Sequence, residues 1–180
     1  RKQPKAVVQD YVEVPAQLIK AHEGIILFAD VMYIENIPFL VTLSKHVKLC
    51  TIKWIFDRTK ETFMKGLDEV FMQYNKKGFY IKQFLADNEF ECVRDPLEAN
   101  DIDVNIAAAQ EHVPEIERQI RTIKERYRAR YQATPYSMWP KLMVIRGAYD
   151  VVKWLNTFPP KGGISPQFSP RTIITGRPIE

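Results

Sequence analysis

The stretch GIILFADVMYI, residues 24–34, is a nearly unbroken apolar run rich in β-branched and aromatic residues. Such a run is typical of a β-strand buried inside a sheet. One residue, Asp30, does not suit that environment, because burying an ionised carboxylate without a partner costs several kcal/mol. The same predicted strand therefore also carries the first candidate for a functional site.

Two further strands are expected directly after this one. The segment ENIP breaks the apolar run, and FLVTLS (39–44) then has the composition of a second strand. In VKLCTIKWIF (47–56), apolar and polar residues alternate well enough to predict a third strand. Short connections between the three predict antiparallel pairing. Before them, PAQLIKAHEG predicts a short helix that Gly24 ends.

A longer helix and two more strands follow. Asp57 is expected to cap a helix in the segment DRTKETFMKGLDEVFMQYNKKG, which Gly78 ends. The segment FYIKQFLAD (79–87) predicts a fourth strand, and since it is reached through a helix we expect it to run parallel to its neighbour. After the polar stretch RDPLEAND, the segment DVNIAA (103–108) predicts a weaker fifth strand.

Helical patterns dominate the rest of the chain. Pro114 suits a first helical turn, and apolar residues then recur every three or four positions as a buried stripe: Ile116, Ile120, Ile123, Tyr127 and Tyr131. Another helix is predicted from Pro140 to about Asn156 and is stopped by Pro159. A loop follows, and the tail RTIITGRPIE shows no clear periodicity. The predicted elements indicate an α/β fold in which helices pack against a mixed sheet.

The composition bounds the class of protein. At 180 residues, with 46% hydrophobic and 27% charged residues, the chain is expected to form one globular domain rather than a disordered segment. No run of about 18 apolar residues is present and the start lacks the apolar core of a signal peptide, so we expect no membrane span. The two cysteines, Cys50 and Cys92, favour a reducing intracellular setting and, with the three histidines, lack zinc-ligand spacing.

Three carboxylates stand out, and each also has an ordinary explanation. Asp30 could reach solvent at a strand end or pair with a lysine, and Asp87 could form a turn with Asn88. Glu117 could pair with Arg121 one helical turn later, which is worth only a few tenths of a kcal/mol. Two neighbouring strands that each carry an aspartate near their end nevertheless indicate a shared site.

The helix that contains Glu117 also carries a basic stripe. Glu117, Arg121, Lys124 and Arg128 stand at helical spacing beside the apolar stripe. Residues 113–133 contain six basic residues against three acidic ones. A nucleic-acid phosphate backbone would use that excess, although the net charge of +4 for the whole chain is modest.

These residues together resemble a known family. The segments FAD with Asp30, LADNEFE with Asp87 and IERQIRTIKER with Glu117 are similar to the DDE catalytic core of retroelement integrases, specifically of the copia-type retrotransposon polyprotein. The C-terminal pattern LNTFPP…SPRTIITGRP is also similar to the copia type, and the resemblance covers roughly residues 23–178. The family commonly has a glycine after its second Asp-Asn pair, where this chain has Glu89.

The resemblance implies an RNase H-like fold, an α/β architecture with a five-stranded mixed sheet of three antiparallel strands plus two parallel ones, flanked by helices. It also implies an organisation in three parts. Residues 1–22 would be an N-terminal segment or linker, residues 23–158 the integrase catalytic core, and residues 159–180 a Pro/Gly-rich loop and tail.

The activity that the resemblance implies is metal-dependent 3′-end processing and strand transfer on DNA. Asp30, Asp87 and Glu117 would be the catalytic residues and would also hold two Mg²⁺ (or Mn²⁺) ions. Glu115 is a rival for the third position, but the Glu-Arg dipeptide of Glu117 and Arg118 matches the family better.

The resemblance also implies partners. Arg121 and Lys124 match DNA-contacting positions of the family, and Arg118 and Arg128 are further DNA-binding candidates. The DNA would be the element ends and the target, and joining two ends implies a homo-oligomer. The protein would be found in a cytoplasmic particle and then, at integration, in the nucleus.

Two other functions remain open. An RNase H-like nuclease or DNA transposase would use the same acids and give different products. A catalytically inactive module for nucleic-acid binding or assembly could also derive from an integrase. The tryptophans Trp54, Trp139 and Trp154 lie in apolar settings and are expected in the core rather than in base-stacking positions.

Overall fold

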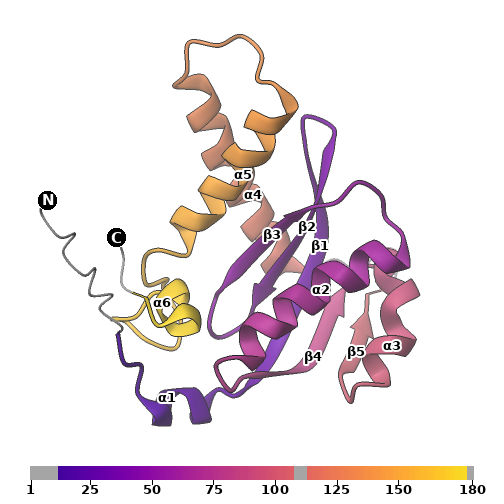
Figure 1. Cartoon of the computed structure of the whole chain (residues 1–180), viewed down its shortest axis with the longest axis vertical. Coiled ribbons are helices and arrows are strands. Elements are labelled where there is room, and N and C mark those ends of the chain that lie inside the picture. Colours follow the sequence, from indigo (N-terminus) through magenta and orange to yellow (C-terminus); the bar gives the residue numbers. More distant parts are fainter. Residues whose placement is uncertain (1–11, 108–112, 178–180) are drawn as a thin grey trace, which may run out of the picture.

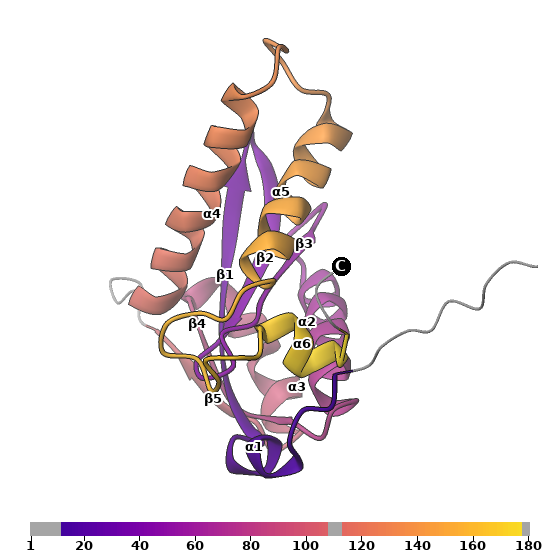
Figure 2. The ribbon, with the colours of Figure 1, turned by 90° about the vertical axis from the view of Figure 1, so that its left-hand side faces the viewer.

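The computed structural model describes residues 12–107 and 113–177, with helices on both faces of a central sheet (Figure 1; Figure 2). The strands are β1 (Gly24–Ile34), β2 (Ile37–Ser44), β3 (Cys50–Trp54), β4 (Tyr80–Ala86) and β5 (Asp103–Ile106). The helices are α1 (Ala16–Ala21), α2 (Lys60–Asn75), the 3₁₀ helix η1 (Asn88–Val93), α3 (Arg94–Glu98), α4 (Pro114–Gln132), α5 (Lys141–Leu155) and α6 (Pro170–Thr175).

The five strands form one sheet in the order β3-β2-β1-β4-β5. β1 pairs antiparallel with β2, and β2 with β3, whereas β4 runs parallel to β1 and β5 parallel to β4. The predicted mixed sheet is therefore confirmed. β1 lies in the middle of it, which explains why its sequence is apolar almost throughout.

The connection between β1 and β2 is a two-residue turn. Ile34 pairs with Ile37, and the residues between them, Glu35 and Asn36, have φ angles of 48° and 61°. Positive φ at both central positions defines a type I′ turn, whose twist matches that of the flanking strands. β2 consequently begins at Ile37, earlier than the predicted residue 39.

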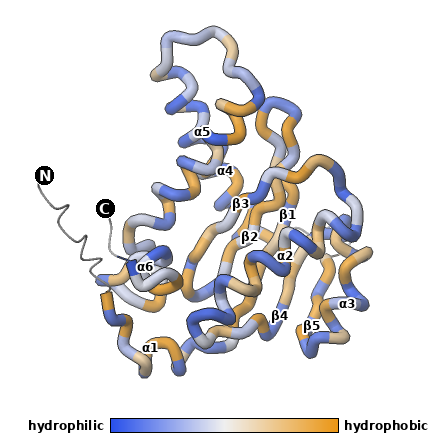
Figure 3. The backbone as a smooth tube through the Cα atoms, in the orientation of Figure 1, coloured by the Kyte–Doolittle hydropathy of each residue, from blue (hydrophilic) through white to orange (hydrophobic). Residues whose placement is uncertain are grey.

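Alternate residues of β1 serve two separate cores, because successive side chains of a strand point to opposite faces. Leu27 and Ala29 belong to the core that α2, η1, α3 and α6 cover, whereas Phe28 and Met32 belong to the core that α4 and α5 cover. Figure 3 shows hydrophobic residues concentrated in the central strands. Asp30 has the parity of Phe28 and Met32 and therefore lies on the α4 side of the sheet.

Helices α4 and α5 pack closely together and are tied to the sheet. A Cβ atom at Gly147 would lie 2.6 Å from the Trp139 ring and 3.2 Å from the Tyr127 ring, so the approach of α5 to α4 requires glycine. At the end of α5, the Asn156 side chain accepts a hydrogen bond from the Cys50 N–H at 2.9 Å and donates one to the Cys50 carbonyl at 2.6 Å. This double pairing holds α5 to the start of β3.

Some element boundaries differ from the predictions. Thr59 rather than Asp57 is the N-cap of α2, and Asp57 instead accepts hydrogen bonds from the hydroxyls of Thr59 and Thr62. β3 starts only at Cys50, because a turn with Lys48 at a φ of 60° precedes it. β4 ends at Ala86, one residue before Asp87, and β5 is limited to four residues.

Three short helices were not predicted. The polar stretch after β4 folds into η1 and α3, which contribute the buried residues Phe90, Val93 and Leu97. In the tail, the Ser169 hydroxyl accepts a hydrogen bond from the Thr172 N–H at 3.1 Å and caps α6, which adds Ile173 and Ile174 to the core beneath α2. All three are too short for a periodic pattern to show in the sequence.

The tryptophan prediction is wrong for two of the three residues. Trp54 is 38% exposed and Trp154 is 60% exposed, while Trp139 is half-buried. Trp54 lies on β3, an edge strand of the sheet, and Trp154 lies on the outer side of α5. An apolar sequence setting therefore did not mean burial in either case.

Parts of three predicted segments lie outside the described residues. These are residues 1–11 of the N-terminal segment, Ala108 of the fifth strand and residues 178–180 of the tail. Among the helices that the structure describes, none combines the length and the apolar character needed to cross a membrane.

Candidate active site

Asp30 lies on β1, and Asp87 directly follows the parallel strand β4. The last pair between β1 and β4 is Ala29 with Ala86, so the two aspartates are the next residues in the same register. Neighbouring strands lie about 4.8 Å apart, so the ladder ends with the two aspartates close to each other, and the charge of Asp87 acts on Asp30. Asp87 also continues the α4 face of β4, since Phe84 and Ala86 belong to the opposite core.

The side chain of Asp87 is not explained by the turn that follows it. The Asp87 carbonyl accepts a hydrogen bond from the Phe90 N–H at 2.9 Å at the start of η1. The carboxylate, in contrast, makes no capping hydrogen bond to that helix. Turn formation therefore uses the Asp87 backbone and leaves its carboxylate for another role.

Asp30 is half-buried, and this burial raises the pKa of its carboxyl group to about 6. The Val31 N–H, which donates to Asp30 at 2.6 Å, acts in the opposite direction. The negative charges of Asp87, Glu89 and Glu117 then raise the pKa further. The proposed pairing of Asp30 with a lysine is not seen among the described residues; the charges that act on Asp30 are those of other acids.

Helix α4 brings Glu117 and part of the basic stripe to Asp30. Ile116, Ile120 and Ile123 bury the apolar face of α4, and this orients the adjacent stripe. A cavity of about 280 Å³, which we call the carboxylate cavity, is lined by Asp30, Glu117, Ile120, Arg121, Lys124, Glu125 and Arg128. Five of the seven predicted site residues share this cavity. A sixth, Asp87, is the strand neighbour of Asp30.

Two residues beside Glu117 are directed elsewhere. The Arg118 Nε donates a hydrogen bond to the Pro114 carbonyl at 3.2 Å, back along α4, and Arg118 does not line the carboxylate cavity. Glu115 lines a different cavity, of about 500 Å³, together with Lys45 and Gln83. Residues two positions apart face different sides of a helix, so the arrangement favours Glu117 over Glu115 as the partner of Asp30.

Glu89 is a fourth acid near this site that the sequence analysis did not select. It lies in η1, acts on the pKa of Asp30 and forms an ion pair with Arg58 from the loop between β3 and α2. The departure of Asp-Asn-Glu from the family's glycine was visible in the sequence. That Glu89 acts on Asp30 could not be seen in the sequence, because the 3₁₀ helix that contains Glu89 was not predicted.

The residue types at this site suit a hard divalent cation, because Mg²⁺ and Mn²⁺ prefer carboxylate oxygens. As placed, however, no three of the described Asp, Glu, His and Cys side chains form a group that could hold a metal ion. Asp30, Asp87 and Glu117 would have to turn toward one another to do so. Their mutual repulsion opposes that movement until a cation neutralises it.

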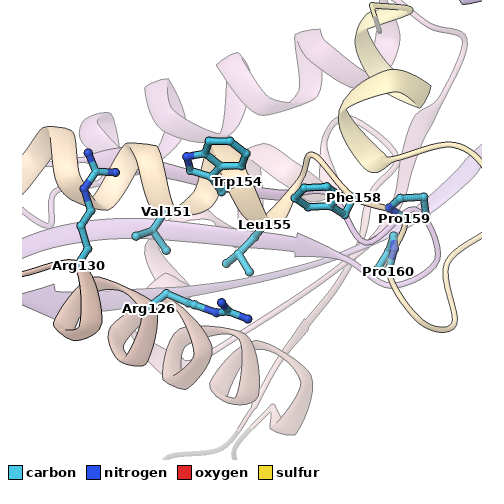
Figure 4. A pocket seen from close by; sticks show the side chains of 8 residues that line it. All are labelled: Arg126, Arg130, Val151, Trp154, Leu155, Phe158, Pro159 and Pro160. Atoms are coloured by element: carbon cyan, nitrogen blue, oxygen red, sulfur yellow. The ribbon is translucent and has the colours of Figure 1, made fainter. Parts of the chain in front are cut away.

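A larger hollow, of about 600 Å³, lies away from the carboxylates between α4, α5 and the segment that follows α5 (Figure 4). Trp154 and Phe158 stack there with ring centroids 6.4 Å apart and an interplanar angle of 16°. Arg126 and Arg130 line the α4 side of this α4–α5 hollow. The basic residues of α4 are therefore divided between two surfaces of different character.

Comparison with solved structures identifies the fold. The chain is similar to the catalytic core domain of BIV integrase, with a TM-score of 0.59 and 15% sequence identity over 83% of this chain and 92% of that one. The fold is RNase H-like, as in an integrase core. No protein-family model and no curated protein matches the sequence. The predicted fold is thus confirmed, whereas the resemblance to the copia type stays a prediction.

Proposed function

We propose that this chain is the catalytic core of a retrotransposon integrase of the copia type, which trims DNA 3′ ends and joins them to target DNA. The observation that carries the proposal is the convergence of acids on Asp30. Asp30 and Asp87 are the residues after the last β1–β4 pair, Glu117 lines the same cavity as Asp30, and both Asp87 and Glu117 raise the pKa of Asp30. Carboxylates brought together at this cost in repulsion are typical of functional sites.

The likeness to an integrase core supports the same conclusion through the fold. In an α/β sheet, sites form beyond the carboxyl ends of parallel strands, and β4 ends immediately before Asp87. The copia type itself rests on the sequence motifs around Asp30, Asp87 and Glu117 and on the C-terminal Ser-Pro…Gly-x-x-Pro pattern.

In this proposal Asp30, Asp87 and Glu117 would hold Mg²⁺ or Mn²⁺ once their side chains turn toward one another. A pair of such ions supplies activation of the attacking oxygen and stabilisation of the departing one during displacement at phosphorus. Half-burial of Asp30 lowers the local dielectric and so strengthens the attraction between its carboxylate and a cation. The residues themselves act by position and charge, and no covalent bond to the protein is needed.

Arg121, Lys124 and Arg128 would hold the DNA backbone, since they line the same cavity as Asp30 and Glu117. Contacts to phosphates fix the position of a strand but do not read its sequence. Arg118, which donates to the Pro114 carbonyl, is expected to contribute less than these three. The proposal further implies element ends and target DNA as partners, a homo-oligomer that holds two ends, and passage from a cytoplasmic particle to the nucleus.

A strand-transfer assay with an end-labelled DNA duplex and Mg²⁺ or Mn²⁺ tests the proposal. Asp30→Asn, Asp87→Asn and Glu117→Gln should each lower the rate by a factor of about a thousand or more and leave DNA binding nearly unchanged. Glu115→Gln is the matched control, because it removes a charge from the same helical turn but outside the carboxylate cavity. Wild-type activity in any of the first three variants overturns the assignment of that residue.

The products of the same assay separate the other candidate functions. A nuclease cleaves the labelled strand and joins nothing. A non-catalytic module gives neither product, and one observation favours it: the described acids, as placed, form no group for a metal. Thermal unfolding with added Mn²⁺ decides this point independently of catalysis, because an ion held by the three acids raises the melting temperature of the wild type but not of Asp30→Asn.

A further inference from the structure

Two histidines from distant parts of the chain meet at the surface, and neither lines the carboxylate cavity. His22 is the C-cap of α1, and His46 lies in the turn between β2 and β3. Their ring centroids are 6.2 Å apart, with an interplanar angle of 54°. His22 is half-buried and His46 is exposed. The fold alone brings them together, because their spacing in the sequence matches no metal-binding motif.

Separate hydrogen bonds hold the backbone on both sides of this contact. In the β2–β3 turn, the Ser44 N–H donates to the Leu49 carbonyl at 3.1 Å, and the Ser44 hydroxyl accepts from the Leu49 N–H at 3.0 Å. At the end of α1, the Glu23 carbonyl accepts from the Tyr80 N–H at 2.8 Å, which ties His22 to the start of β4. A site whose backbone is fixed before a ligand arrives loses less entropy on binding.

The tautomer of His22 is set by a hydrogen bond to the backbone. The His22 Nδ1 lies 3.1 Å from the Leu18 carbonyl oxygen. Because a carbonyl can only accept, Nδ1 carries the proton, and in the neutral ring Nε2 keeps a lone pair. The same Nδ1–H···O=C bond orients histidines that bind metals through Nε2. His22 is therefore prepared as a metal ligand.

The surroundings of His46 keep its ring neutral near pH 7. Partial desolvation, followed by the charges of Lys45, His22 and Lys48, lowers the pKa of His46 below its usual value of 6.5. A neutral imidazole is the form that binds a metal.

The two lysines beside His46 also repel a cation, but weakly. Lys45 lines the cavity of about 500 Å³ that contains Glu115, so its side chain is directed to another surface. In water, a lysine charge about 8 Å away weakens the binding of a divalent ion by less than about ten-fold, and salt reduces this effect. Two imidazole ligands can therefore outweigh it.

We propose that His22 and His46 bind one divalent transition-metal ion, such as Zn²⁺, through one nitrogen of each ring. Imidazole suits zinc, copper and nickel, whereas the acids of the carboxylate cavity suit hard ions such as Mg²⁺. The described residues offer no group of three Asp, Glu, His or Cys side chains for a metal, so water completes the coordination. The bound ion links α1 to the β2–β3 turn. This inference goes beyond the proposed function and does not depend on it.

The distance between the rings agrees with this ligand. A Zn–N bond is about 2.0–2.1 Å long, which puts each ring centroid about 3.2 Å from the ion and the two centroids about 5–6 Å apart. The observed 6.2 Å requires a closure of about 1 Å or less. The exposed side chain of His46 can make this movement by turning about its own bonds. An anion such as phosphate fits less well, because it favours protonated rings and the His46 ring is neutral.

The test is a calorimetric titration of the full chain, without a histidine tag, with Zn²⁺ near neutral pH. Excess Mg²⁺ is present to compete for sites made of carboxylates. We expect one Zn²⁺ per chain and a higher melting temperature with Zn²⁺ than with EDTA. His22→Gln and His46→Gln should each weaken Zn²⁺ binding by about ten-fold or more. The double variant should be little weaker than either single one, because either change already leaves one imidazole. Melting temperatures in EDTA check that the variants fold.

Lys45→Gln is the matched control, because it changes the neighbour of His46 in the same turn and removes no ligand; it should bind Zn²⁺ at least as tightly as the wild type. Asp30→Asn should also bind Zn²⁺ like the wild type, which separates this site from the carboxylate cavity. Three results would each overturn the proposal: no Zn²⁺ uptake by the wild type, wild-type affinity in either histidine variant, or stabilisation by inorganic phosphate and not by Zn²⁺. None of them bears on strand transfer, so this site and the proposed function stand or fall separately.

Discussion

The two basic faces of α4 carry similar charge and have different surroundings. Arg121, Lys124 and Arg128 line the carboxylate cavity with Asp30 and Glu117. Arg126 and Arg130 line the α4–α5 hollow, whose other walls are apolar or aromatic and include the stacked pair Trp154 and Phe158. Arg130 is also paired with Asp150 at 2.8 Å.

The basic excess of residues 113–133 is therefore not one continuous surface. Helical spacing directs arginines at positions 126 and 130 to a different side of α4 from Arg121 and Lys124. The former pair belongs to the packing of α4 against α5, and the latter pair belongs to the proposed DNA site.

The largest expected effect is on DNA affinity. Replacing Arg121 and Lys124 together by alanine should weaken binding by about ten- to a hundred-fold at low salt, because two phosphate contacts are lost. The slope of log affinity against log salt should fall by about 1.8, at 0.9 per contact. Binding titrations at several salt concentrations measure both quantities.

The matched control is the double replacement of Arg126 and Arg130, which removes the same charge from the same helix. We expect it to change the affinity less than three-fold and the salt slope by less than about 0.5. Equal losses in the two double variants would mean that DNA binding responds to net charge alone. The distinction between the faces of α4 would then be wrong.

The next expected effect is a loss of stability when the contact between the end of α5 and the start of β3 is removed. Asn156→Ala removes both hydrogen bonds to the Cys50 backbone and leaves those two groups partly buried without a partner. The free energy of unfolding should fall by about 2–3 kcal/mol, measured by urea denaturation. Asn105→Ala, at an exposed position of β5, should change it by less than about 0.5 kcal/mol. DNA affinity of the folded Asn156→Ala chain should stay near wild type, since this contact serves packing.

Much of the fold could be predicted from the spacing of apolar residues in the sequence. The apolar run of β1, the stripe of isoleucines on α4 and the turn residues between strands predicted the element order and the mixed sheet. Asp30 and Asp87 were visible because a carboxylate within an apolar strand, or directly after one, is costly to bury. That Ala29 pairs with Ala86, and so makes the two aspartates neighbours, was not visible, because register is set by contacts between strands.

The features that sequence reasoning missed depend on neighbours distant in the chain. Glu89 reaches Asp30 through a 3₁₀ turn, and Trp54 and Trp154 are exposed because β3 is an edge strand and α5 has an open side. Tyr127 and Tyr131 were correctly assigned to the apolar stripe of α4. That His22 and His46 lie side by side, however, becomes apparent only once α1 meets the β2–β3 turn in the fold.

The pH dependence of stability tests the raised pKa of Asp30, the acid that lines the carboxylate cavity together with Arg121 and Lys124. The pKa of Asp30 is about 6 in the folded chain, against an ordinary value of 3.8. The folded chain therefore holds this proton more tightly than the unfolded chain does. The resulting stabilisation is fully present below about pH 4 and is lost as the pH rises through 6. Asp30→Asn, which carries no charge, should therefore be more stable than the wild type at pH 8 and equally stable near pH 4. Thermal unfolding across this range measures the difference; a constant difference would contradict the raised pKa.

The smallest expected effect concerns the ion pair between Arg130 and Asp150, whose side chains are 43% and 46% exposed. A double-mutant cycle with alanine at both positions should give a coupling free energy of about 0.2–1 kcal/mol that declines with added salt. The same Arg130→Ala variant should bind DNA within two-fold of the wild type, because its guanidinium is already engaged by Asp150 on the α5 side. A loss of DNA affinity as large as that of Lys124→Ala, together with no coupling to Asp150, would mean that DNA reaches around α4 into the α4–α5 hollow, and that Trp154 and Phe158 lie on its path.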